Sequence, residues 1–199
     1  MGTADIIGLI LFYTLALALF IALIVFVIKY KSPTARGKRG ERKVTKMLLR
    51  IQKQCGGYVI NDIVLPIGQT TTQIDHIYIS SKGIFVIETK NYSGRIYGDE
   101  SSRYWKQVLA NGNTKHKMYN PLMQNETHAS AVRKLVFSWV PVISMVVFVQ
   151  GNIHCIKSNR VFSIPYAESV IVSQNDFLNN GQVDDVYTKI ARANLNSRK

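Results

Sequence analysis

The sequence of 199 residues contains little cysteine, little proline and few acidic residues. Its two cysteines, Cys55 and Cys155, lie far apart and outside any Cys-x-x-Cys or Cys/His cluster, which excludes a disulfide-rich miniprotein and argues against a zinc site. Five prolines in a chain that is 47% hydrophobic exclude a collagen-like or disordered protein. With 12 acidic against 25 basic residues the formal net charge is +13, which indicates an anionic partner, either nucleic acid or an acidic membrane surface.

A long uncharged run occupies residues 6–28 near the N-terminus. At helical rise this run is long enough to cross the hydrocarbon core of a bilayer. A cleaved signal peptide is the alternative, but the run is longer than a typical signal-peptide core, and Asp5 stands before it without any Lys or Arg. We therefore expect residues 1–31 to form a transmembrane signal anchor that leads into a basic flank, and residues 32–39 to form a linker.

The positive charge is concentrated directly after the apolar run. Ten basic residues lie between Lys29 and Lys53 with one acid, Glu41, so this segment carries +9 of the net +13. Cations at one end of a span indicate a cytoplasmic location for that end and an external N-terminus. They also attract anionic lipid, by about 1 kcal/mol per residue close to the surface. We expect a single-pass membrane protein with a cytoplasmic domain, whose lipid contact at Lys29–Lys53 accounts for most of the charge.

The remainder of the chain predicts one α/β domain over residues 40–199. Apolar residues at helical spacing predict a helix over about 40–54, and Pro121 opens a second one. Runs rich in β-branched and aromatic residues predict strands. The expected strands are 58–65, 73–79, 84–90, 95–97, 104–109, 140–149 and 169–173, and the expected later helices are 120–137 and 184–194. This α-β-β-β-α-β order with additions indicates a mixed sheet with helices on its faces.

Three ionisable residues interrupt the apolar strands, namely Asp75, Glu88 and Lys90. Alternate residues of a strand share a face, so Glu88 and Lys90 point the same way. Ser80-Ser81-Lys82-Gly83 is a hairpin signal between the two strands. An even-numbered loop centred between Ser81 and Lys82 places Asp75 directly opposite Glu88, with Cβ atoms about 4.5–5.5 Å apart, whereas a three- or five-residue loop would break this alignment. Two facing carboxylates repel each other unless a cation lies between them, and both Lys90 and a divalent ion are candidates. The alternative is a solvent-facing strand end where the three groups are simply hydrated.

Four short segments carry a family resemblance. They are GERKV at 40–44, QIDHI at 73–77, GIFVIETKNY at 83–92 and NPLMQN at 120–125. Together they closely resemble the nuclease-related domain family, NERD, over residues 37–149. That family is similar to the restriction-endonuclease-like, PD-(D/E)xK fold, whose core order agrees with the α-β-β-β-α-β order above. Ile74 rather than proline precedes Asp75, which is a departure from the broader nuclease signature.

The resemblance implies a role for each residue at a matching position. Asp75 and Glu88 would bind a divalent metal, Mg²⁺ or alternatively Mn²⁺, and Lys90 would be the catalytic lysine. The metal would polarise a phosphate and activate water, and Lys90 would orient the water or stabilise charge. Glu41 and Gln124 would support the site. The alternatives are that Glu41 is an acid favoured by a helix N-terminus and that Gln124 is a helix-surface amide.

Other polar and aromatic residues give weaker signals. His76 is expected to point away from Asp75 and to be a packed histidine rather than a ligand. The remaining histidines show no ligand spacing: His116, His128 and His154. Aromatic residues near the site either stack on nucleobases or belong to the core: Tyr92, Tyr97, Tyr104 and Trp105.

These observations favour a membrane-anchored, divalent-metal-dependent nuclease that hydrolyses phosphodiester bonds, with DNA preferred over RNA. A catalytically silent nucleic-acid-binding or scaffold module on the same fold is the alternative, and the complete set of Asp75, Glu88 and Lys90 favours the enzyme. A lipid-surface protein acting through Lys29–Lys53 would explain the charge but not the acids within apolar strands.

Overall fold

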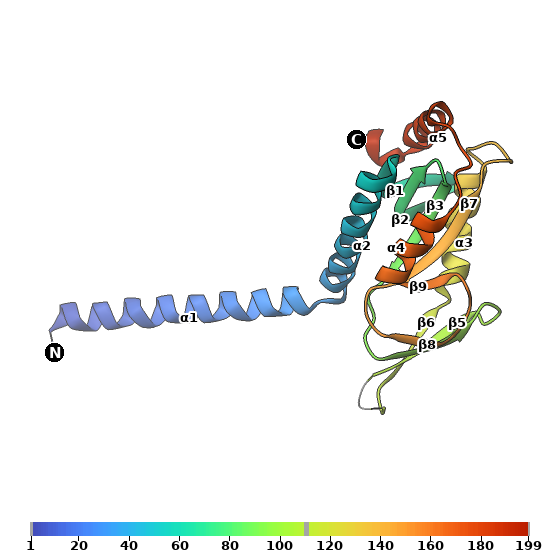
Figure 1. The fold of residues 1–199 in the computed structure, drawn as a ribbon. Coiled ribbons are helices and arrows are strands. Elements are labelled where there is room, and N and C mark those ends of the chain that lie inside the picture. The colour runs from blue at the N-terminus through green and yellow to red at the C-terminus, as the bar shows by residue number, and fades with distance from the viewer. Residues whose placement is uncertain (1, 110–111, 199) are drawn as a thin grey trace. The chain divides into compact units, whose positions relative to one another are not determined.

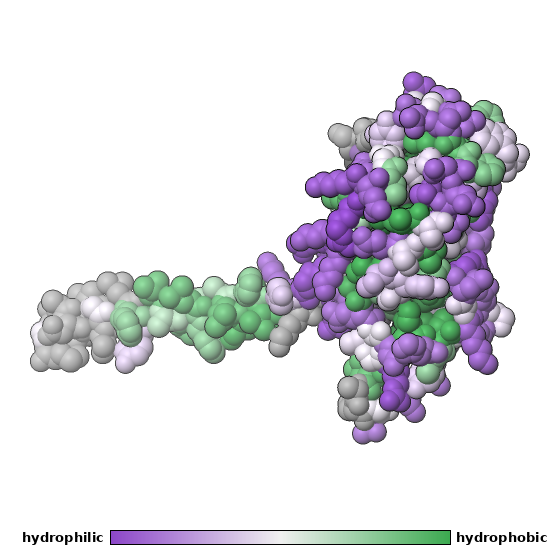
Figure 2. Space-filling model, viewed as in Figure 1, coloured by the Kyte–Doolittle hydropathy of each residue, from purple (hydrophilic) through white to green (hydrophobic). Residues whose placement is uncertain are grey.

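The structure, a computed structural model, describes residues 2–109 and 112–198 (Figure 1). The chain divides into two units, Met1–Arg39 and Gly40–Lys199. The first unit contains helix α1 (Thr3–Lys31), in which the 19 residues Phe12–Tyr30 are long and apolar enough for a membrane span or a signal sequence. Figure 2 shows apolar residues along the described part of this helix. Among the described residues, α1 is the one helix that is long and apolar enough to cross a membrane.

Helix α2 (Pro33–Cys55) begins earlier than the helix predicted over about 40–54, so residues 33–39 of the predicted linker are helical. The Ser32 hydroxyl accepts a hydrogen bond from the Ala35 N–H at 3.2 Å, which caps the helix. Pro33 occupies the first helical position, where its missing N–H costs nothing. The Ser-Pro pair is thus a helix start rather than a loop signal.

The first sheet has five strands in the order β1-β2-β3-β7-β9. Its first three strands are antiparallel and the last two pair in parallel. The β2–β3 hairpin pairs Ser80 with Gly83, so its loop is the two residues Ser81-Lys82, which confirms the register expected for an even-numbered loop. Gly83 has a φ of 113°, a conformation that favours glycine at the end of this loop. The strands are β1 (Tyr58–Ile67), β2 (Thr70–Ser80), β3 (Gly83–Lys90), β7 (Val142–Phe148) and β9 (Val161–Ser163).

Helices cover both faces of this sheet. Helices α3 (Pro121–Arg133) and α5 (Asn180–Ala193) bury one apolar cluster, and α2 and α4 (Ile164–Ser173) bury another on the opposite face. The strand predicted at 169–173 is wrong, because these residues lie in α4. A proline in the first turn starts this helix, and Ala167 and Ile171, one helical turn apart, supply its buried stripe. A short 3-10 helix, η1 (Leu195–Arg198), follows α5.

A second sheet, which the sequence analysis did not separate from the first, has the order β6-β5-β4-β8. Its inner face buries Ile96, Trp105 and Met118 against Leu122 of α3 and Phe148 of β7. Strands β6 and β8 escaped prediction because they are short and largely polar, and β9 because it has only three residues. The mixed α/β class is confirmed, with two sheets instead of one. The strands are β4 (Arg95–Asp99), β5 (Tyr104–Val108), β6 (Lys115–Tyr119) and β8 (Asn152–Lys157).

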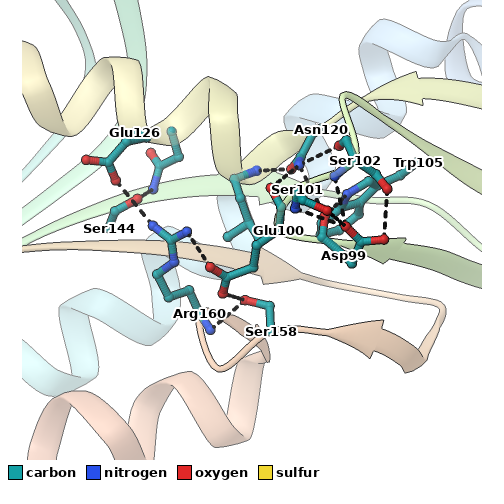
Figure 3. Close-up of polar contacts among 12 residues, drawn as sticks. Asp99, Glu100, Ser101, Ser102, Trp105, Asn120, Glu126, Ser144, Ser158 and Arg160 are labelled. Carbon is teal, nitrogen blue, oxygen red and sulfur yellow. Dashed lines mark hydrogen bonds and ion pairs between the residues drawn. The ribbon is translucent and has the colours of Figure 1, made fainter.

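The turn between β4 and β5 anchors the start of α3 (Figure 3). The Asp99 carboxylate accepts four hydrogen bonds from Ser101 and Ser102, which lower the pKa of Asp99 to about 2. Asn120, the N-cap of α3, donates its side-chain N–H to the Ser102 carbonyl at 2.8 Å and accepts from the Leu122 N–H at 2.8 Å. One asparagine therefore connects the second sheet to the helix that enters the candidate site.

A second polar network ties α3 to the segment between β8 and β9 (Figure 3). Arg160 lies 2.9 Å from Glu100 Oε2 and 3.3 Å from Glu126 Oε2. Ser158 donates to the other Glu100 oxygen at 2.7 Å. These groups are partly exposed, so we assign them to alignment of α3 rather than to a large gain in stability.

Candidate active site

The predicted acids lie on neighbouring strands of the hairpin. Asp75 is in β2 and Glu88 is in β3, at positions that continue the observed register by one pair beyond His76 and Ile87. The Asp75 Oδ2 atom accepts a hydrogen bond from the Thr89 N–H at 2.8 Å. The hairpin therefore brings both carboxylates to the same end of the sheet.

The alternation of side chains in β2 breaks at this point. Ile74 and Ile77 belong to the same core cluster although they are three positions apart, whereas a regular strand would point them to opposite faces. Asp62, between the pairs formed on either side of Asp75, has a left-handed φ of 53°. We infer that, because of this local irregularity, the Asp75 side chain need not point to the face that strict alternation along β2 predicts.

Glu88 is buried, with a side chain that is only 4% exposed, and it contacts two basic groups. Its Oε1 lies 2.7 Å from Lys90 Nζ, and its Oε2 lies 3.3 Å from His128 Nε2. Burial acts to raise the pKa of Glu88, but the His128 imidazole and the Lys90 ammonium outweigh it, and the pKa is lowered. Glu88 is therefore ionised and already partly neutralised by the protein.

Lys90 is held between two oxygens. Besides Glu88, its ammonium donates to Gln124 Oε1 of α3 at 3.0 Å. Gln124 is thus part of the cluster rather than the plain surface amide considered above. These two contacts fix the position of the Lys90 ammonium between β3 and α3.

Asp75 lies in a less compensated environment than Glu88. Burial first, and then the negative charge of Glu88, raise the pKa of Asp75 to about 7. The charge of Glu41 adds to the increase, while the Thr89 N–H and Lys90 oppose it. The structure thus brings the negative charges of Glu41, Asp75 and Glu88, which we call the acid cluster, within electrostatic range of one another.

Glu41 reaches the cluster through a close helix contact. It is half-buried on α2, beside Gly40. A Cβ added to Gly40 would lie 2.7 Å from Cβ of Asn91, just beyond the end of β3. A glycine at this position therefore permits the approach of α2 to the strand that carries Glu88 and Lys90.

His128 is a site residue that the sequence analysis missed. Its Nδ1 lies 2.7 Å from the Thr72 hydroxyl, and its Nε2 faces Glu88 without hydrogen-bond geometry. If Thr72 donates to Nδ1, the ring proton lies on Nε2, directed toward the carboxylate. His128 follows Gln124 by four residues on α3, so helical spacing was the signal that could have found it.

His76 is a packed residue, as predicted. It is buried, with Nδ1 2.7 Å from Asn61 Oδ1 and Nε2 3.1 Å from Thr89 Oγ1. Burial lowers the pKa of His76 to about 4, so the ring is neutral. Since Asn61 Oδ1 is an acceptor, the proton lies on Nδ1 and the Thr89 hydroxyl donates to Nε2.

Asn125 fixes α3 on the sheet. Its side-chain nitrogen lies 2.9 Å from each of three acceptors, the carbonyls of Val86 and Met145 and the hydroxyl of Ser144. These contacts bridge β3 and β7 beneath the helix. Asn125 therefore has a structural role: it fixes the position of α3 on the sheet, and with it the positions of Gln124 and His128 beside the acid cluster.

The acid cluster offers carboxylate oxygens, which are the ligands that hard divalent cations prefer. In the described ranges 2–109 and 112–198, no group of three or more His, Cys, Asp and Glu side chains is arranged to hold a metal. Mg²⁺, however, commonly uses one or two carboxylates and completes its shell with water and substrate phosphate. Asp75 and Glu88, on adjacent strands, are carboxylates of that number and kind, so the residues present fit such an ion.

Comparisons with known proteins point in one direction. The family model of the nuclease-related domain, NERD, matches residues 36–149. An uncharacterized protein of Bacillus anthracis is 36% identical over 176 residues, which cover 85% of this chain and 82% of the relative. No solved structure matches the chain. The matched range contains Glu41, Asp75, Glu88, Lys90 and Gln124.

Proposed function

Because the chain belongs to the NERD, nuclease-related domain family, we propose that it is a divalent-metal-dependent nuclease that hydrolyses phosphodiester bonds, with DNA as its preferred substrate. The observation that carries the proposal is the convergence of two strands and a helix on one group of charges. Asp75 from β2, Glu88 and Lys90 from β3 and Gln124 from α3 lie within one hydrogen-bonded and electrostatic cluster.

The protein groups have distinct roles in this proposal. Phosphodiester hydrolysis concentrates negative charge on the phosphate oxygens as water attacks in line. Lys90, whose position is set by Glu88 and Gln124, would stabilise that charge or orient the water. His128 would hold Glu88 from the far side and is a positioning residue. Asp75, with its pKa near neutrality, would exchange a proton for a cation on binding.

Asp75 and Glu88 are the residues that would hold Mg²⁺ or Mn²⁺, with Glu41 as a further carboxylate nearby. When bound, such an ion supplies Lewis-acid polarisation of the phosphate and a lower pKa for water. The fit depends on Glu88 exchanging part of its contact with Lys90 for the cation. Hard divalent cations prefer oxygen ligands such as carboxylates, and this preference supports the assignment.

A catalytically silent nucleic-acid-binding module is the second candidate. The observation that favours it is the 2.7 Å contact of Lys90 with Glu88, which neutralises one carboxylate internally. In that case the acid cluster would be a structural ion network, and no divalent ion would be required. The two candidates differ in one measurable property, which is the response of the protein to metal.

A cleavage assay tests the proposal. The full chain, held in phosphatidylcholine nanodiscs because of α1, is incubated with DNA and RNA substrates in Mg²⁺, Mn²⁺ or EDTA. We expect cleavage with metal that is lost in Glu88→Gln and Asp75→Asn and retained in Glu168→Gln. Glu168 is a matched control because it is a carboxylate in a surface ion pair with Arg50. Cleavage that survives in EDTA or in Glu88→Gln would refute the metal site.

We also propose where the protein lies in the cell. Helix α1 would be a membrane anchor, with the N-terminus outside and the domain in the cytoplasm. The apolar segment Phe12–Tyr30 and the cations of Lys29–Lys53 support it. We also propose that this flank contacts anionic lipid. Protease added to intact cells should spare the domain, and its digestion from outside would overturn the orientation.

A further inference from the structure

The outer face of the second sheet gathers tyrosines and cations on one side. Cross-strand partners point the same way, and the observed register aligns Tyr97 with Lys106, Lys106 with Lys117 and Tyr104 with Tyr119. All of these side chains are exposed, whereas their sequence neighbours Ile96, Trp105 and Met118 are buried beneath. We call this surface the tyrosine face and define it by Arg95, Tyr97, Tyr104, Lys106, Lys117 and Tyr119.

The rings of this face are partly exposed and lie among positive groups. Tyr97 is 37% exposed, and Tyr104 and Tyr119 are each 46% exposed. The Lys117 ammonium lies 3.8 Å from the centre of the Tyr104 ring, so a ring and a cation share the same side of the sheet. Stacking surface and positive charge are therefore combined within a few side chains.

The charge of the second sheet is mostly positive. The described residues of its four strands contain five Lys and Arg residues and a single acid, Asp99, whose carboxylate is occupied by Ser101 and Ser102. The resulting +4 equals the net charge of the whole chain outside Lys29–Lys53, which is +13 less +9. A partner for this face should accordingly be a polyanion.

The face also contains a hollow of about the size of a small ligand. Its volume is about 530 Å³, and Arg95, Tyr97 and Val108 line it together with Gly94 and Asn152. Pockets of this size hold small molecules or single groups of a larger ligand. An arginine and a tyrosine at its wall suit a nucleotide, with the ring for the base and the guanidinium for the phosphate.

We propose that the tyrosine face binds single-stranded nucleic acid, whose unpaired bases stack on the tyrosines while its phosphates contact the cations. The inference rests on the proposed function, because it names the form of nucleic acid that would reach the acid cluster. The bases of a duplex stack on one another and leave no ring surface for tyrosine, which is why the exposed rings select a single strand.

The position of the face relative to the acid cluster suits this role. Arg95 at the start of β4 follows Lys90 at the end of β3 by only five positions, so their Cα atoms lie within about 18 Å. In Figure 1 the strands β5, β6 and β8 lie at the end of the domain away from α5. A strand bound on the face could thus extend into the cluster.

An anionic membrane is the competing partner for a basic aromatic surface. Surfaces that enter a bilayer interface bury Trp, Phe or Leu. In the described strands of this sheet, the large apolar side chains that are exposed are all tyrosines. The lack of exposed Trp, Phe and Leu in these described strands argues against insertion into the bilayer, but tyrosine also occurs at the headgroup level, so binding to vesicles is an outcome that the experiment must detect.

The test measures binding in EDTA, where metal-dependent cleavage cannot contribute. The full chain in phosphatidylcholine nanodiscs is titrated into a labelled oligodeoxythymidylate and followed by fluorescence anisotropy. Tyr97→Ala/Tyr104→Ala should weaken binding at least tenfold, since each stacked ring contributes about 1–3 kcal/mol. Lys106→Gln/Lys117→Gln should reduce the slope of log affinity against log salt by about 1.4. The matched controls Tyr166→Ala/Phe177→Ala and Lys134→Gln/Lys189→Gln should leave both quantities unchanged.

Three results would overturn the inference. They are equal loss of binding in variants and controls, equal affinity for a duplex of the same length, and loss of binding to phosphatidylserine vesicles but not to the oligonucleotide. The result for the proposed nuclease is read separately, from cleavage of a small phosphodiester, bis-p-nitrophenyl phosphate. If the variants bind poorly but cleave this ester normally, both ideas stand. If wild type never cleaves but the variants still lose binding, the face stands without the nuclease.

Discussion

The ammonium of Lys90 lies 2.7 Å from Oε1 of Glu88, two positions earlier on the same strand. Because of this contact, the carboxylates of Glu88 and Asp75 lie in different electrostatic environments. Glu88 has a lowered pKa because basic groups surround it, whereas Asp75 has a raised one because burial and Glu88 disfavour its charge. The electrostatic cost of placing two acids together therefore falls on Asp75.

Asp75→Asn should stabilise the metal-free protein at pH 8 and have little effect at pH 4. The folded wild type keeps the Asp75 proton up to about pH 7, while the unfolded chain releases it near its ordinary value of about 4. Folding therefore takes up a proton between these values, and wild-type stability falls as the pH rises from about 4 to about 7. The asparagine still accepts the Thr89 N–H.

Thermal melting of the full chain in EDTA, followed by fluorescence of the buried Trp105, measures this effect. Asp176→Asn is a control of opposite sign. Hydrogen bonding from Ser81 and the charge of Lys82 lower the pKa of Asp176, so its ionised form stabilises the fold above pH 4. Equal pH profiles for wild type and Asp75→Asn would show that Asp75 carries no such charge penalty.

Lys90→Met should abolish cleavage and enlarge the melting-temperature gain on adding metal. Without its ammonium, Glu88 loses a partner in a mostly buried pair, which should cost on the order of 3 kcal/mol in the metal-free state. A divalent ion would then restore the missing positive charge, and binding to the native state stabilises by about 2.7 kcal/mol at a hundredfold excess over Kd. Calorimetry with and without Mn²⁺ measures the gain, and a smaller gain than in wild type would place Lys90 among the groups that metal binding needs.

Thr72→Val should reduce the cleavage rate without removing the metal response. The valine is close in shape, but the buried Nδ1 of His128 then has no donor, which should cost about 1–3 kcal/mol of unfolding free energy. The ring loses its fixed orientation toward Glu88, so kcat should fall more than KM rises. Thr71→Val is the matched control, because Thr71 is the preceding residue and its own side chain is exposed. Identical kinetics for both variants would refute a positioning role for His128.

Gly40→Ala should lower both stability and activity. The added methyl group would meet the Cβ of Asn91 at 2.7 Å, so α2 must move outward and carry Glu41 with it, at a cost of about 1–3 kcal/mol. Gly181→Ala on α5 is the control, since its Cβ would have an ordinary contact at 3.5 Å and alanine favours the helix by about 0.5–1 kcal/mol. Unfolding by urea compares the two, and opposite signs are expected.

The parts that local rules govern could be predicted from the sequence. The two-residue loop at Ser81-Lys82 sets the pairing of β2 with β3, and parity then places Glu88 and Lys90 on one face. The contacts of Lys90 with Gln124 and of Glu88 with His128 depend on how α3 lies across β3, which periodicity does not specify. The same holds for Tyr119 on β6, a strand whose lysines resemble those of a solvated loop.

The parallel pairing of β3 with β7 has a consequence during synthesis. Lys90 pairs with Phe148, which follows it by 58 positions, so one edge of β3 lacks its neighbour until that part of the chain is made. A ribosome that adds about 5–20 residues per second needs roughly 3–12 seconds for this interval. Throughout it, the nascent hairpin exposes an open edge along a strand destined for the interior, which is a template for pairing with other chains. The yield of folded protein in a cell should therefore depend on translation rate and on chaperone protection of this edge.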